Sequence, residues 1–200
     1  HELAELLAFE ENGFPADHPF APIPVTPDGV KLPPIHLLGS SGASASAAGQ
    51  LGLGYAFAAH FSATPPAPAI AAYREAFRPS AMFAAPHAIL AVSALVAPTL
   101  EEARLLSRSQ EVSWALFHSG ELRRLLPPEE VAAWPLTPSQ QAIIARQSKL
   151  WIVGNPQAVK AEITAQAEAA GADEVMVTTT VWSHAARLRS YELLAEAFAL

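Results

Sequence analysis

The chain has 200 residues, of which 51% are hydrophobic and only 16% are charged, so it can bury a sizeable core and is not a disordered protein. It contains no cysteine, which excludes disulfides, thiolate nucleophiles and cysteine-ligated metals. The formal charge of −7 is spread without a basic run, which argues against nucleic acid and membrane partners. Without a long apolar run or a signal segment, a cytoplasmic protein is expected.

The first residues predict a helix and then a proline-rich loop. Apolar residues in the stretch 3–9 have helical spacing, and Asn-Gly at 12–13 predicts the end of that helix. The chain begins inside this pattern with His1, so we expect further residues upstream. Thr-Pro-Asp-Gly at 26–29 is turn chemistry, which makes 23–25 and 30–32 the arms of a small irregular hairpin.

Residues 35–48 combine an apolar strand, a glycine-serine turn and the start of a helix of small residues. A turn of this kind offers free backbone N–H groups and the positive end of a helix dipole to an anion. Ser40, Ser41 and Ser44 add hydroxyl groups, and glycine lets a ligand approach the backbone closely. The same pattern also fits a tight connection with an N-cap serine.

Apolar runs and helical patterns alternate along the rest of the chain. We predict strands at 55–61, 87–97 and 174–180, and a short apolar run at 152–154. The predicted helices are one that ends at Gly52 or Gly54, one at 68–77, one from Thr99 past Trp114, one at 156–170 and one over 188–198. Prolines interrupt the pattern at about 120–148 and predict short helical pieces in an insertion.

Four strands that alternate with four helices, with no hairpin between neighbours, predict a parallel α/β sheet covered by helices. A complete eight-unit barrel has about 250 residues, so this chain looks like the latter half of one. An open doubly wound sheet has the same periodicity and remains an alternative. We expect residues 1–200 to form a single domain that includes the insertion.

Five segments together resemble the bacterial luciferase-like, flavin-dependent monooxygenases. In the order of that family they are 37–45, 50–58, 153–159 with its Val-Gly-Asn-Pro start, 171–177 as the last barrel strand, and 187–195 as the C-terminal helix of one subgroup.

The resemblance implies a (β/α)8 TIM barrel, of which this chain supplies roughly the last four βα units. The first four strands, and with them the catalytic histidine of the family, are not in this sequence. Half a barrel would expose two sheet edges and an interior face, so we expect either a longer protein or another chain that completes it. An isolated 200-residue enzyme is the least expected of these forms.

The resemblance also implies a cofactor, partners and a reaction. Reduced FMN from a separate flavin reductase would bind at the strand ends, with its phosphate at Gly39, Ser40, Ser41, Gly42 and Ser44. Dioxygen would then give a C4a-peroxyflavin that oxidises a small organic substrate such as an aldehyde, in a homodimer. Ala43 replaces a residue that is often larger in similar proteins, so that side of the cradle would be looser. The alternatives are a deazaflavin cofactor, a catalytically silent flavin-binding protein of the same fold, and a cofactor-free α/β protein.

His60 is the one candidate catalytic residue, because it lies at the carboxyl end of its predicted strand, where barrel enzymes place working groups. A histidine that is simply hydrogen-bonded at the surface fits the same position. Polar and aromatic residues after the last strand either line the same mouth or serve the strand and the final helix: Thr178, Thr179, Thr180, Trp182 and His184.

The remaining polar and aromatic residues are expected to be structural. Arg187 and Arg189 would pair with acids on a neighbouring helix, and three tryptophans would fill space between helices: Trp114, Trp134 and Trp151. Seven histidines without a close pair or a carboxylate cluster predict no metal site. The turn at 39–43 lacks the Gly-x-Ser-x-Gly pattern, which argues against a serine hydrolase.

Overall fold

A computed structural model describes residues 2–10, 13–24, 27 and 29–200. The chain forms two units, His1–Ile35 and His36–Leu200, and each is described by itself. In the described parts no helix is long and apolar enough to cross a membrane.

The first unit contains the predicted first helix, α1, at Glu2–Glu10. After it, the Gly13 N–H donates to the Ala8 carbonyl at 2.8 Å, which turns the chain. Phe9, Phe14 and Phe20 pack their rings 4.8 to 5.8 Å apart. The predicted hairpin is not seen where the structure describes this loop: 23–24 and 30–32 have no strand, while residues 25, 26 and 28 lie outside the described part.

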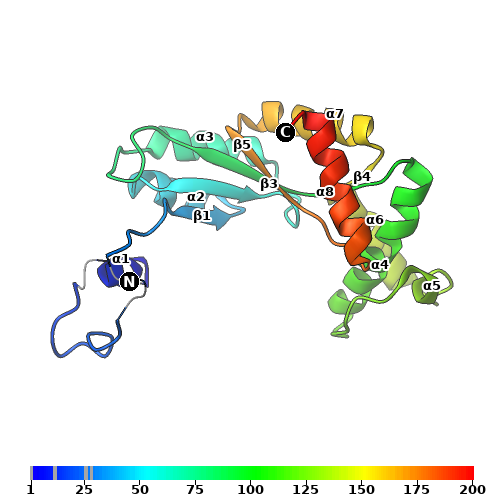
Figure 1. Ribbon diagram of the computed structural model, residues 1–200, viewed down its shortest axis with the longest axis horizontal. Coiled ribbons are helices and arrows are strands. Elements are labelled where there is room, and N and C mark those ends of the chain that lie inside the picture. Colours follow the sequence, from blue (N-terminus) through cyan, green and yellow to red (C-terminus); the bar gives the residue numbers. More distant parts are fainter. Residues whose placement is uncertain (1, 11–12, 25–26, 28) are drawn as a thin grey trace. The chain divides into compact units, whose positions relative to one another are not determined.

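The second unit is built on five parallel strands (Figure 1). They are β1 His36–Gly39, β2 Gly54–Ala58, β3 Ala88–Val96, β4 Trp151–Gly154 and β5 Glu174–Thr178. The prediction of a parallel sheet is confirmed. The expected number of four strands is wrong, because the short apolar run at 152–154 pairs with the second half of β3 and forms a strand of its own.

Strand β3 is the centre of this sheet, since β2, β4 and β5 all pair with it. Its Ala91 carbonyl accepts the N–H of His60, which follows β2. The N–H of Ala97, which follows β3, donates to the Gly154 carbonyl of β4. The Ala94 carbonyl of β3 instead accepts the Thr179 hydroxyl, which follows β5. Because the backbone groups of successive strand residues point to opposite sides, β2 and β4 share one side of β3, and β5 takes the other.

Helices connect the strands, and short helical pieces fill residues 120–148 as expected. They are α2 Gly42–Gln50, α3 Pro66–Ala76, α4 Leu100–His118, α5 Pro128–Val131, α6 Pro138–Gln147, the 3₁₀ turn Ser148–Leu150, α7 Pro156–Ala170 and α8 His184–Phe198. The predicted caps hold at α4, where Thr99 accepts the Glu102 N–H, and at α7, where Asn155 accepts the Ala158 N–H and Gly171 is left-handed. Helix α2 ends at Gln50, earlier than predicted.

The two faces of the sheet differ. Tyr55, Phe57, Leu90 and Val92 point into a core shared with α2, α3, α7 and α8. Residues that pair across neighbouring strands have their side chains on the same face of the sheet. Leu38 pairs with Ala56, and Met176 pairs with Ala91. These four side chains therefore lie on the face opposite to the core. There Leu38 is 59% exposed and Met176 50%. Among the described residues, β1 pairs only with β2 and β5 only with β3, so these five strands form an open sheet.

The amino ends of the strands are tied together by Asp173. Its carboxylate accepts the Ala88 N–H at 2.7 Å and an Arg74 N–H at 2.8 Å. Burial by itself raises the pKa of this carboxyl group, but the bonds from Ala88 and Arg74 outweigh it and hold the pKa below the usual 3.8.

We expect Asp173→Asn to lower the free energy of unfolding by about 1 kcal/mol near neutral pH, a value reduced for partial solvent exposure. The folded-state pKa is depressed, so this stabilisation is complete above the unfolded pKa and disappears as the pH falls through the folded pKa. Urea unfolding of both proteins should therefore show a constant difference well above pH 3.8 that shrinks as the pH falls below that value. The exposed Glu75→Gln is the matched control, and a difference that persists in acid would refute the assignment.

Candidate functional site

The glycine-serine turn lies at the carboxyl end of β1. The strand ends at Gly39 and α2 begins at Gly42, with Ser41 as the N-cap residue in an extended conformation. No side chain caps this helix, and the first N–H groups of a helix have no partner within it. Ser41, Gly42 and Ala43 are exposed. The turn therefore presents backbone donors and the positive end of a helix dipole to solvent.

Inside the turn, the Ser41 carbonyl collects several donors. The Ser44 hydroxyl donates to it at 2.9 Å and the Tyr55 hydroxyl at 3.3 Å, while the Ala45 N–H donates at 3.2 Å. Ser44 Oγ also lies 3.4 Å from Ser41 Oγ. The hydroxyl proton of Ser44 is thus used within the turn, so the weak 3.4 Å contact takes the Ser41 hydroxyl as its donor. The Ser40 hydroxyl remains to donate to a ligand, and the Ser41 hydroxyl can do so by turning away from Ser44.

Tyr55 is the residue of this site that the sequence prediction missed. It was predicted only as part of a buried strand, and its side chain is indeed buried, yet its hydroxyl reaches the turn from β2. Burial raises the pKa of Tyr55, partly offset by a hydrogen bond with Ser44, so the phenol stays protonated and donates. The sequence holds no signal for this contact, because Tyr55 lies fourteen residues from Ser41 and reaches it through the pairing of β1 with β2.

The two glycines of the turn have different reasons to be glycine. A Cβ on Gly39 would collide with the Ser44 hydroxyl and lie 2.7 Å from its Cβ. A Cβ on Gly42 would meet no protein atom within 4 Å. Gly39 is therefore required by packing inside the turn, whereas Gly42 borders open space.

His60 lies just past the carboxyl end of β2, the neighbour of β1. Its N–H donates to the Ala91 carbonyl at 3.0 Å, and its ring Nδ1 lies 3.3 Å from the same oxygen. The ring also meets Phe61 edge-on with centroids 4.4 Å apart. The structure thus places His60 at the same edge of the sheet as the turn, held against β3. Its proposed catalytic role stays a prediction.

Thr178, the last residue of β5, and Thr179, which follows it, are engaged in structural contacts, whereas Thr180 and Trp182 are exposed. The Thr178 hydroxyl donates to Val92 and the Thr179 hydroxyl to Ala94, which fastens the chain to β3. The first residue of α8 is His184, but Ser183 is its N-cap. Arg189 pairs with Glu192 and Glu196 of its own helix, not with a neighbouring one as expected, and Arg187 contacts His184.

The tryptophans pack as predicted. Trp114 lies with its ring centroid 6.2 Å from that of Trp151, and Trp134 packs against a small cluster formed by Val112, Leu116 and Val131. No group of three metal-ligating side chains occurs in the part of the chain that the structure describes.

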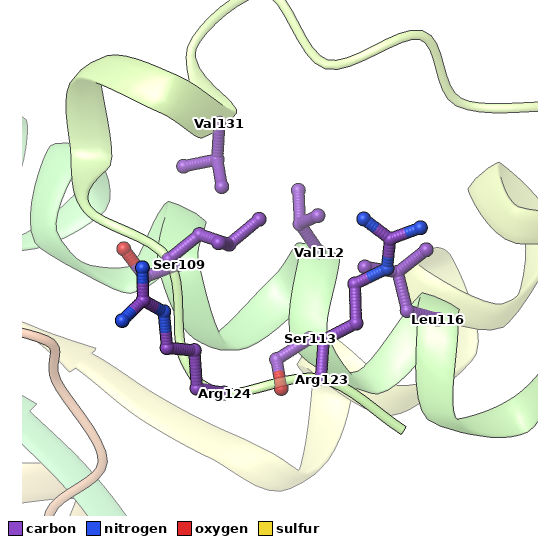
Figure 2. A pocket seen from close by; sticks show the side chains of 8 residues that line it. Ser109, Val112, Ser113, Leu116, Arg123, Arg124 and Val131 are labelled. Atoms are coloured by element: carbon purple, nitrogen blue, oxygen red, sulfur yellow. The ribbon is translucent and has the colours of Figure 1, made fainter. Parts of the chain in front are cut away.

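A cavity of about 10 Å³ lies next to that small cluster (Figure 2). Figure 2 shows Val112 and Val131 in the cavity wall, with the Arg123 and Arg124 side chains on either side of Val112 in this view. Buried Ser109 Oγ, also in the wall, has no hydrogen-bond partner among the described residues. The volume holds about one water molecule, so neither a flavin nor an organic substrate fits here.

Comparison with known proteins finds that the chain is similar to a luciferase-like monooxygenase. It is 33% identical over 192 residues to an Escherichia coli K12 luciferase-like monooxygenase, covering 96% of this chain and 56% of that protein. It is 40% identical over 163 residues to YvbT of Bacillus subtilis strain 168, covering 82% and 48%. The crystal structure of apo-MsnO8 matches with a TM-score of 0.82 at 33% identity, covering 99% and 59%. The chain thus spans about half the length of its relatives, and no family model matches it.

More distant solved structures share the fold alone. The oxygenating constituent of 3,6-diketocamphane monooxygenase from Pseudomonas putida, in complex with FMN, has a TM-score of 0.52 at 20% identity, covering 84% of this chain and 49% of that one. An F420-dependent secondary alcohol dehydrogenase with an F420–acetone adduct has a TM-score of 0.53 at 15% identity, covering 86% and 50%.

The two glycines give a paired test of the turn. We expect Gly39→Ala to lower the free energy of unfolding by about 1–3 kcal/mol, because the added methyl group must displace Ser44. Gly42→Ala should stay within about 0.5 kcal/mol of the wild type. Urea unfolding measures both, and equal effects of the two changes would contradict the packing described above.

Proposed function

Because this chain belongs to the luciferase-like monooxygenase family, we propose that residues 39–44 bind the phosphate of FMN. The observation that carries the proposal is the exposed, uncapped start of α2 at the carboxyl end of β1, with open space at Gly42. In open parallel sheets and barrels, ligands bind at the carboxyl ends of the strands.

The donors available to the phosphate are of two kinds. The Ser40 hydroxyl can donate to the phosphate, as can the Ser41 hydroxyl once it gives up its 3.4 Å contact with Ser44, and the Gly42, Ala43 and Ser44 N–H groups start the helix. The turn from Gly39 to Ser44 contains no cationic side chain. Binding would therefore rest on hydrogen bonds and the helix dipole, as at other helix N-termini that hold phosphate.

The proposed reaction is oxidation of a small organic substrate such as an aldehyde. Reduced FMN, supplied by a separate reductase, provides the two electrons that activate dioxygen; one oxygen atom enters the product and the other leaves as water. The residues of this chain would hold the cofactor and help exclude water, and His60 stands at the same sheet edge as the phosphate turn. The alternative is a catalytically silent flavin-binding protein that uses the same turn, and a deazaflavin is the alternative cofactor.

We further propose that the sheet is the second half of a (β/α)8 barrel, with residues 120–148 as an insertion. Leu38 and Met176 are half-exposed on the face away from the core, and β1 and β5 each have a free edge among the described residues. Beside β5, an apolar groove of about 510 Å³ opens between α7 and α8, lined by Val175, Val177 and Phe198 among others. Exposed faces and edges of this kind are normally covered.

The phosphate proposal is tested by comparing FMN with riboflavin, which lacks the phosphate. We expect the full chain to quench FMN fluorescence with at least about tenfold lower Kd than riboflavin, because several charge-assisted hydrogen bonds are made only by FMN. The double change of Ser40 and Ser41 to Ala should remove most of this preference and leave riboflavin binding unchanged. In a preparation in which the barrel is complete, reduced FMN, a medium-chain aldehyde and ¹⁸O₂ should yield carboxylic acid with one ¹⁸O atom. Equal affinities would refute the phosphate site, and FMN binding without labelled product in the complete barrel would establish the silent binder.

The barrel proposal is tested by Met176→Asp. A covered interior position should lose more than about 2 kcal/mol of unfolding free energy on burial of an unpaired charge. Leu122→Asp, at a side chain that is 84% exposed, is the control and should change little. If Met176→Asp is as harmless as the control, that face of the sheet is solvated and the barrel is not completed.

A further inference from the structure

We infer that Tyr55 and Ser44 are positioning residues that aim the Gly42 N–H at the phosphate by holding the Ser41 carbonyl in place. The inference rests on the proposed phosphate site and adds to it a device that fixes the direction of one donor. It assigns to a buried side chain of β2 a part in cofactor affinity, although Tyr55 itself touches no ligand.

The carbonyl of Ser41 is held by more donors than an ordinary helix-starting carbonyl. The Ala45 N–H is the usual partner four residues on, at 3.2 Å. The Ser44 and Tyr55 hydroxyls are two additional partners, at 2.9 and 3.3 Å. The three donors come from the helix, the turn and β2, and together they fix the orientation of the Ser41 carbonyl.

That direction determines where the next N–H points. The peptide between Ser41 and Gly42 is planar and trans, so its C=O and N–H point in opposite directions. With the carbonyl held by donors of the protein, the Gly42 N–H points the opposite way. A Cβ on Gly42 would meet no atom within 4 Å, so there is open space next to this residue. A peptide that precedes glycine can rotate easily, because glycine tolerates the φ values that result. The Tyr55 and Ser44 bonds oppose that rotation.

Tyr55 is suited to hold the carbonyl because its own position is fixed. Its side chain is fully buried, its ring lies 5.6 Å from that of Tyr73, and its Cε2 lies 3.8 Å from where a Cβ on Gly39 would be. Ser44 is fixed through its close packing against Gly39. A preorganised donor costs less free energy to order when the ligand binds.

The test is Tyr55→Phe, with Tyr73→Phe as the matched control. Tyr73 is equally buried in the same core, and its hydroxyl donates to the Leu53 carbonyl at 2.9 Å, away from the turn. The readout is the ratio of the riboflavin Kd to the FMN Kd, which isolates the contribution of the phosphate. We expect Tyr55→Phe to lower this ratio roughly five- to tenfold, the effect of weakening one charge-assisted hydrogen bond, and Tyr73→Phe to leave it within about twofold.

Ser44→Ala is a second variant that changes only a partly exposed hydroxyl, and we expect the same direction of change from it. Titration of ¹⁵N-labelled protein with inorganic phosphate gives a direct readout, since the Gly42 amide resonance should move in the wild type and in Tyr73→Phe but much less in Tyr55→Phe. A normal ratio in Tyr55→Phe and Ser44→Ala would overturn the inference, as would an equal loss of FMN and riboflavin binding. A wild-type ratio near one would instead refute the phosphate site itself, so the two failures are distinguishable.

Discussion

Parallel pairing around β3 is the constraint on which the second unit depends. All nine residues of this strand are buried, and three other strands use its backbone groups. A strand covered on both faces must be apolar along its whole length, which is why Ala88–Val96 is the longest apolar strand of the sequence. Strand β1 is parallel to β2, and β2 is parallel to β3, so β1 runs in the same direction as β3. The serine turn, which follows β1, therefore lies at the same end of the sheet as the carboxyl end of β3.

The amino ends and the carboxyl ends of the parallel strands have different roles. At the amino ends, Asp173 joins Ala88 to Arg74, and His36 Nε2 lies 3.0 Å from His87 Nδ1. These contacts tie strands together. At the carboxyl ends, the start of α2 is exposed and has no side-chain cap. In parallel α/β barrels the amino ends of the strands usually serve stability and the carboxyl ends serve binding, and the phosphate site that we propose follows that division.

Local chemistry made part of the fold predictable. Asn155-Pro156 and Gly171 bracket α7 correctly because an N-cap, a first-turn proline and a left-handed glycine act within a few residues. The early end of α2 could not be predicted from the glycines alone. A Cβ at Gly49 would lie 2.6 Å from the Tyr73 carbonyl, so that glycine serves close helix packing, and Gly52 is the residue with positive φ. Strand β4 has four residues, too few for periodicity to distinguish a strand from a loop.

The turn at 39–44 was predicted from residue types, but the use of each residue was not. Ser44 was expected to donate to a ligand, yet its hydroxyl donates to Ser41. Tyr55 lies fourteen residues from Ser41, and only the register of β1 with β2 brings them together. Long-range pairing of this kind has no sequence signal in a single chain.

The central position of β3 also governs how the chain is made. Its partners β4 and β5 begin only at Trp151 and Glu174. When the nascent chain has been synthesised and exposed as far as Val96, β3 is therefore an apolar strand that can pair only with β2. Nearly eighty further residues must be translated before β5 can cover the second side. Non-local contacts of this length slow folding and leave intermediates prone to aggregation until β5 has been made.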